Sequence, residues 1–169
     1  MEDSVDRHLA RWRGKAPYDE TVEAVITRLQ KLAKHVANSK RRMHAEVGLA
    51  DFEFQTLHSL AARDDHRATP SELAAELLLS PAGITGRLDA LEQAGLIRRI
   101  RGTADRRRVD VELTPAGHEK WMAGMRFQDE VERQIVGALD ERERARVNAL
   151  LKKMLMRAEA LAAADAAGD

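Results

Sequence analysis

Apolar residues recur at every third or fourth position along most of this chain, a spacing that predicts a mainly helical protein. The longest such stripe lies between Glu20 and Gly48 and consists of Val22, Val25, Ile26, Leu29, Leu32, Ala33 and Val36. The same spacing predicts further helices at 4–13, 50–62, 115–138 and 140–161. We expect the remaining residues at the C-terminus, 162–169, to fray.

Two short helices joined by a tight turn are predicted between 70 and 95. Each starts with a capping residue followed by proline, as Thr69-Pro70 and Ser80-Pro81, and Gly95 ends the second. The second helix has an apolar inner face, Ile84, Leu88 and Leu91, and an outer face of small or polar residues, Pro81, Ala82, Thr85, Gly86 and Asp89. This arrangement is typical of a helix-turn-helix, although many helical hairpins share it.

A β-hairpin is predicted directly after the second helix. Residues 96–101 and 109–113 alternate as strands, and 102–105 has the composition of a turn. From 98 to 108 there is one acidic residue, Asp105, against six arginines: Arg98, Arg99, Arg101, Arg106, Arg107 and Arg108. Such a run is often only a solvated face. Beside a capped helix pair, however, it indicates contact with phosphate.

Composition narrows the function without naming it. The 28 basic and 28 acidic residues cancel, so the chain is not a uniformly basic protein that coats nucleic acid. The absence of cysteine excludes disulfides and thiol chemistry. The acidic start is unlike a secretory signal, and no apolar run has the length of a membrane span. We therefore expect a cytoplasmic protein with no membrane partner, no cofactor and no enzymatic activity.

The helix-turn-helix from Ser71 to Gly95 and the segment from Asp105 to Gly117 resemble the MarR family of winged-helix regulators. The most specific part is the aspartate, the arginine two residues after it and the closing Leu113-Thr114. The resemblance implies a mainly α fold with a small β-hairpin wing (α+β). It further implies N-terminal dimerisation helices at 1–48, a winged helix-turn-helix at 49–114 and C-terminal dimerisation helices at 115–169, forming one compact domain overall.

The resemblance also implies a homodimer that represses transcription from a double-stranded, pseudo-palindromic operator. The recognition helix would enter the major groove, where Thr85 is the best direct reader between small neighbours. We expect the wing tip to reach phosphate or the minor groove and Asp105 to be structural. The candidate DNA-binding residues are Ser80, Pro81, Ala82, Thr85, Gly86, Arg106, Arg107 and Arg108.

A narrower resemblance concerns the tryptophan-bearing helix ahead of this core, which is similar to the urate-responsive branch of the family. The positions that match that branch's ligand residues are Trp12, Glu53, Arg87 and Arg99. They imply a small anionic effector, urate-like, aromatic or polycarboxylate, that releases the protein from DNA. Two structural alternatives stay open: Glu53, where an aspartate is usual, forms an ion pair with Arg87 or Arg99, and Trp12 packs against the neighbouring subunit.

Two further functions compete with this interpretation. The six histidines could serve a metal-sensing regulator, for which His58 and His66, with Asp64 and Asp65 between them, are the best candidates. A helical dimerisation module without specific DNA binding would explain the long helices but not the basic hairpin. An enzyme is less favoured, because no supported catalytic arrangement is present.

Overall fold

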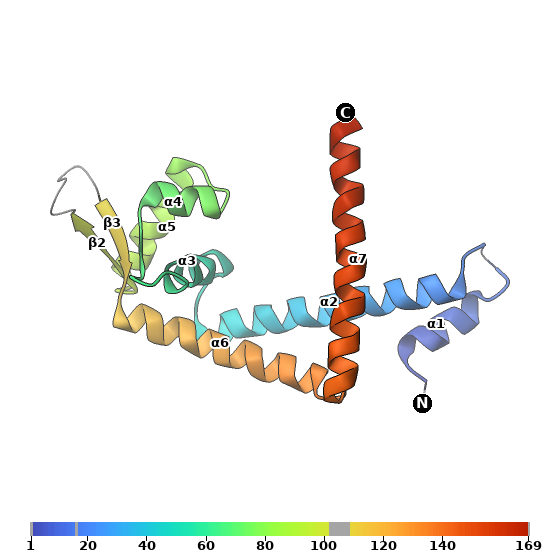
Figure 1. Cartoon of the computed structure of the whole chain (residues 1–169). Coiled ribbons are helices and arrows are strands. Elements are labelled where there is room, and N and C mark those ends of the chain that lie inside the picture. The colour runs from blue at the N-terminus through green and yellow to red at the C-terminus, as the bar shows by residue number, and fades with distance from the viewer. Residues whose placement is uncertain (1, 16, 102–108, 169) are drawn as a thin grey trace. The chain divides into compact units, whose positions relative to one another are not determined.

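The computed structural model describes residues 2–15, 17–101 and 109–168, and the chain divides into two compact units, Met1–Gln128 and Asp129–Asp169. The larger unit holds the N-terminal helices and a winged helix-turn-helix (Figure 1). The smaller unit holds the end of α6 and the whole of α7. None of the described helices is both long and apolar enough to cross a membrane.

Two helices form the N-terminal part of the larger unit. Helix α1, Ser4–Trp12, begins at Asp3, whose carboxylate accepts hydrogen bonds from the first-turn amides, and it buries Val5 and Leu9. Helix α2, Glu20–Val47, ends at Gly48, whose left-handed φ of 61° requires a glycine-like residue. With 28 residues, α2 is about 42 Å long. Helix α1 packs along its first half, as the pairing of Asp3 with Arg28 shows.

The winged helix-turn-helix consists of α3 (Asp51–Ala61), β1 (Arg67–Ala68), α4 (Pro70–Glu76), α5 (Pro81–Gln93), β2 (Ile97–Arg101) and β3 (Val109–Leu113). The sheet has the order β1-β3-β2 and is antiparallel throughout. Strand β2 pairs with β3 in a register that places Ile97 opposite Leu113 and Arg99 opposite Val111.

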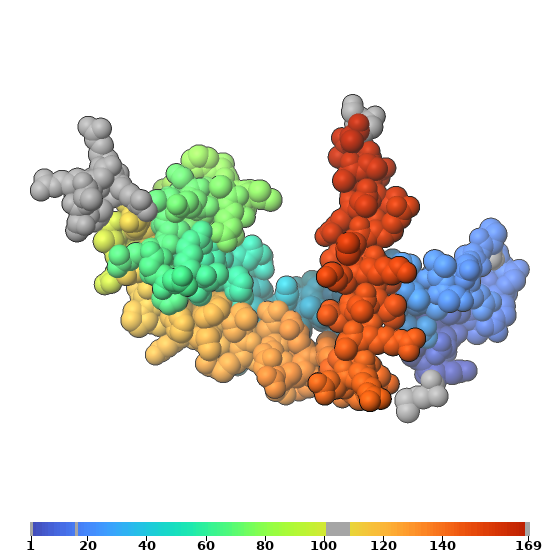
Figure 2. Space-filling model, in the orientation of Figure 1, coloured from blue at the N-terminus to red at the C-terminus, as the bar shows by residue number. Residues whose placement is uncertain are grey.

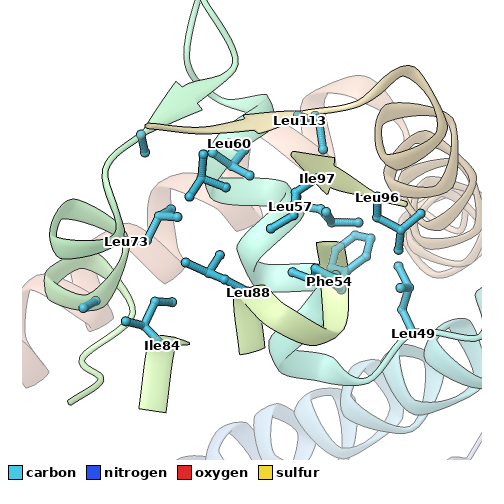
Figure 3. Close-up of a cluster of buried hydrophobic side chains, with 14 of the residues drawn as sticks. Leu49, Phe54, Leu57, Leu60, Leu73, Ile84, Leu88, Leu96, Ile97 and Leu113 are labelled. Atoms are coloured by element: carbon cyan, nitrogen blue, oxygen red, sulfur yellow. The ribbon is translucent and has the colours of Figure 1, made fainter. Parts of the chain in front are cut away.

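One hydrophobic core joins these elements (Figure 3). Its fully buried members include Leu57, Leu60, Leu73, Leu88 and Leu91, which come from α3, α4 and α5. Leu96, Ile97, Val111 and Leu113 close the core from the wing side. Burial of this many large side chains, each contributing about 1.5–3 kcal/mol, fixes the position of α5 relative to α3.

Helix α6, Pro115–Val136, begins in close contact with the base of the wing at Leu96 and Leu113. A Cβ atom added at Gly117 would lie 2.0 Å from the Leu96 carbonyl oxygen, so only glycine permits this approach. Helix α7, Glu141–Gly168, is different: every described side chain on it is exposed, including Leu150, Leu151 and Leu155. Figure 2 shows the surface of α7 in orange to red.

The predicted fold class and the order of helices and hairpin strands are confirmed, and apart from the end of α7 the helix ends lie within about two residues of those predicted. One prediction was wrong. The segment 162–169 was expected to fray, but α7 continues to Gly168, because its alanine-rich end favours helix. The structure also contains a short third strand that the sequence pattern does not predict, Arg67–Ala68, which pairs with β3.

Candidate nucleic-acid interface

Helix α5 presents its two faces as the sequence predicts. Ile84, Leu88 and Leu91 are at most 2% exposed and anchor the helix in the core. The opposite face is open to solvent and carries the predicted reading residues: Ser80, Pro81, Ala82, Thr85 and Gly86. Because these side chains are short, a partner surface can approach the helix closely.

The N-terminus of α5 suits an anion. Ser80 caps the helix by accepting a hydrogen bond from the Gly83 amide at 3.1 Å, and no acidic residue lies in the first turn. The positive end of the helix dipole is therefore not neutralised within the helix. The Thr85 hydroxyl donates to the Pro81 carbonyl at 2.9 Å, which leaves its oxygen to accept and its methyl group to make apolar contacts.

Helix α4 holds α5 from behind and starts with a capping box. Thr69 accepts from the Glu72 amide at 3.2 Å, and the Glu72 carboxylate accepts from the Thr69 amide at 2.7 Å. Between the two helices, Leu78 takes a left-handed φ of 54° and is 92% exposed. Leu78 was not among the predicted functional residues, although three consecutive leucines, 77–79, cannot all lie on one buried helical face.

The basic character of the wing is partly neutralised at its base. Glu112 of β3 forms ion pairs with both Arg98 and Arg67, and hydrogen bonds from these two guanidinium groups lower the pKa of its carboxyl. Arg99 pairs with Asp89 and Glu92, each at 2.6 Å. The positive charge that Arg98 and Arg99 offer to a partner is therefore smaller than the number of arginines in the sequence suggests. Asp105 and the predicted contacts Arg106, Arg107 and Arg108 lie outside the described residues.

The four predicted ligand residues are not gathered in one place. The Arg87 guanidinium lies over the Phe52 ring, 4.7 Å from its centroid. Phe52 is the residue before Glu53 in the sequence. The Glu53 carboxylate caps its own helix by accepting from the Ala50 amide at 2.7 Å. Arg99 is held by Asp89 and Glu92, so neither arginine forms the ion pair with Glu53 that was one alternative.

Trp12 lies away from the other three. It is 44% exposed at the end of α1, where its ring lies 6.4 Å from that of His8. Helix α1 is tied to α2 at Arg28, and the helix continues for about 28 Å from there to Val47 before α3 begins. Within one protomer, Trp12 and Glu53 therefore cannot touch the same small molecule.

A cavity of about 200 Å³ lies between α2, α3 and α6, close to Glu53 but not lined by it. Its walls include Met43, Phe54 and Met125 and the imidazoles of His44 and His58. His44 Nε2 lies 3.1 Å from an Asp51 oxygen, whereas its buried Nδ1 has no partner. Sequence reasoning missed this cavity, because its lining comes from three helices far apart in the chain.

Among the described residues, no three histidine, aspartate or glutamate side chains lie so as to hold a metal ion. His58 instead accepts a hydrogen bond from the Trp121 indole at 3.1 Å, and the His66 ring lies 5.7 Å from that of His118. The two histidines considered for metal binding are thus engaged with different neighbours.

Comparison with known proteins decides the family. The family model described as "MarR family" matches residues 51–109. The HTH-type transcriptional regulator PecS of Dickeya dadantii is 31% identical over 147 residues, which cover 85% of this chain and 88% of PecS. The chain belongs to the MarR family. As a MarR protein it is a transcriptional regulator rather than an enzyme. It has the winged helix-turn-helix that the sequence predicts.

Solved structures agree with the MarR fold. YusO of Bacillus subtilis superposes with a TM-score of 0.74 at 23% identity, covering 83% of this chain and 99% of YusO. A Staphylococcus aureus MepR–DNA complex superposes with a TM-score of 0.66 at 25% identity, covering 76% of this chain and 95% of MepR. The winged helix-turn-helix described above is therefore the arrangement shared with regulators of this family.

Proposed function

We propose that this MarR protein is a dimeric repressor that binds a pseudo-palindromic operator and is released from it by a small anionic ligand. The observation that carries the DNA-binding part is the two-faced helix α5, whose inner side is fixed in the core while its outer side is small, polar and open. A helix of this kind fits the major groove, and its capped, unneutralised N-terminus favours a phosphate.

Dimerisation rests on the apolar residues that a single protomer leaves uncovered. Val147, Leu150, Leu151, Met154, Leu155 and Leu161 form a stripe along α7, and Val22, Val25, Ile26 and Leu32 form another on α2. Monomers rarely expose continuous apolar surfaces of this length. We therefore assign segments 1–48 and 115–169 to dimerisation and 49–114 to DNA binding, and members of the family are dimers.

The operator test uses the intergenic DNA upstream of the chain's own gene. We expect a gel shift on a pseudo-palindrome whose half-sites lie about one helical turn apart. Arg107→Ala should weaken binding to all sequences and reduce the slope of log affinity against log salt by about one. Lys15→Ala, which removes an exposed charge outside the wing and α5, is the control. An unchanged salt slope in Arg107→Ala would remove Arg107 from the phosphate contacts.

Thr85 should act on specificity instead. Its replacement by alanine keeps the small outer face but removes the hydroxyl, so affinity for the operator should fall by about 1–3 kcal/mol while non-specific affinity is kept. Equal losses on operator and random DNA would show that Thr85 does not read a base.

The effector proposal follows the resemblance to the urate-responsive branch and places the site around Glu53, Arg87 and Arg99. Arg99 is already bound by two carboxylates of α5, so an anion would compete with Asp89 and Glu92 for it. Since Arg87 lies on the recognition helix, a ligand that holds it in a new position favours a state with lower DNA affinity.

Because Trp12 is far from Glu53 within a protomer, we infer that Trp12 of the partner subunit completes each site. Urate, hypoxanthine, salicylate and aconitate are the probes, and operator release is the signal. Trp12→Ala and Arg87→Ala should each abolish release. A mixed dimer of these two variants should keep one intact site and respond at about half amplitude, whereas sites built within one protomer would both be lost.

A further inference from the structure

A second charged site lies between α1 and α2, outside the residues used for DNA or effector binding. The two helices enclose an open groove of about 650 Å³, which falls within the range of small-molecule sites. One wall carries Arg7 and Arg11 from α1, and the other carries Lys31 and Lys34 from α2. His8 lies between the arginines on the same wall.

The four cations of this groove are not compensated. Glu23 is the one carboxylate among the lining residues, and it accepts a hydrogen bond from the Thr27 hydroxyl at 2.9 Å. No side chain in the described part of the chain forms a hydrogen bond or ion pair with Arg7, Arg11, Lys31 or Lys34. The groove therefore concentrates like charges at a cost in free energy that an anion would offset.

Outside the groove, two arginines of the same helix pair have carboxylate partners. There Arg28 bridges Asp3 and Asp6, with its Nε 2.8 Å from Asp3, and Arg13 forms a two-point ion pair with Glu20 at 2.9 Å. In this helix pair, two arginines outside the groove thus have carboxylate partners, whereas the four cations that line the groove have none among the described residues. This contrast argues that the groove residues are arranged for a ligand rather than for holding α1 in place.

We propose that the groove binds a compact multivalent anion of the polyphosphate type. Arg7 and Arg11 are four residues apart and Lys31 and Lys34 three apart, so each pair lies on one face of its helix and both pairs converge on the same space. Arginine forks and lysine ammonium groups from two sides match an anion with several oxygens. This site shares no residue with the proposed operator and effector sites.

The test is calorimetric titration of the full-length protein with inorganic tripolyphosphate at constant ionic strength. Arg7→Gln with Arg11→Gln, and separately Lys31→Gln with Lys34→Gln, should each weaken binding by about tenfold or more. The matched control is Lys152→Gln with Lys153→Gln, which removes two exposed charges from α7 and should bind as the parent does. Circular dichroism of each variant checks that the helices are retained.

Absence of tripolyphosphate binding, or equal binding by all three variants, would overturn the proposal. A parallel titration with random duplex DNA separates the other source of phosphate. If the groove variants lose affinity for duplex DNA and keep it for tripolyphosphate, the groove is a DNA contact and the proposal is wrong. Operator binding without tripolyphosphate should be unchanged in these variants. The test of the groove therefore does not depend on the proposed repressor function.

Discussion

The winged helix-turn-helix and helix α7 treat their leucines in opposite ways. In the first, Leu57, Leu60, Leu73, Leu88 and Leu91 are all at 0% exposure within one protomer. On α7, Leu150, Leu151, Leu155 and Leu161 are 41–59% exposed. The two regions have similar helical periodicity in sequence, so periodicity alone does not tell which surface covers an apolar face.

Under the proposed dimerisation, the winged region is stabilised within one chain, whereas the apolar face of α7 would be covered by a second copy. In the winged region, several helices and strands pack around one core. Helix α7 buries none of its described side chains. Isolated helices gain little stability without packing of the apolar face.

The largest effect should come from charging the apolar stripe of α7. Leu151→Arg with Leu155→Arg places two cations where the second copy is expected, so sedimentation should show monomers. Operator affinity should then fall by roughly a hundredfold or more, because two half-sites are no longer bound as a unit. Ala149→Arg, on the opposite side of the helix, is the control. A charged variant that stays dimeric would place the interface elsewhere.

The next effect belongs to the core. Leu88→Ala, at 0% exposure between α3 and α4, should lower the free energy of unfolding by about 2–5 kcal/mol, since it leaves a cavity. Urea denaturation measures this loss, which should be the same at low and high protein concentration. The deficit of the α7 variant should instead grow with concentration, because only the parent gains from association. Leu88→Met, of similar volume, should cost less than about 1.5 kcal/mol.

The smallest effect concerns α1, which has only Val5 and Leu9 buried and depends in part on charge. The hydrogen bond from Arg28 lowers the pKa of the Asp3 carboxyl from 3.8 to about 2. Its contribution to holding α1 is therefore complete above pH 3.8 and is lost as the pH falls through about 2. Trp12 fluorescence, in a Trp121→Phe background, should report this step.

Asp3→Asn serves as the comparison for that titration. The asparagine variant should show weaker docking of α1 at neutral pH and no separate step between pH 3.8 and about 2. An identical step in both proteins would assign the transition to another group.

Local signals carried most of the fold. The caps at Thr69 and Ser80 and the left-handed glycines at 48 and 95 act within a few residues, so their positions could be read from the sequence. Strand β1 could not, because two residues become a strand only through pairing with β3, 45 positions away at Arg67 and Glu112.

The candidate site was predictable to a similar depth. The outward face of α5 followed from helical periodicity alone. The engagement of Arg98 with Glu112 and of Arg99 with Asp89 and Glu92 depends on tertiary placement, and the run of arginines gave no hint of it. The separation of Trp12 from Glu53 depends on the length of α2 and on which part of it α1 contacts.

The close approach at Gly117 links the recognition helix α5 mechanically to the start of α6. The Thr114 amide donates to Leu96 O at 3.1 Å, its hydroxyl donates to Gly95 O at 2.8 Å, and the Gly117 amide donates to that hydroxyl at 3.0 Å. These bonds clamp the end of α5, the start of β2 and the first turn of α6 into a single mechanical block. Any tilt of α5 on DNA that keeps these bonds would therefore move the start of α6 with it.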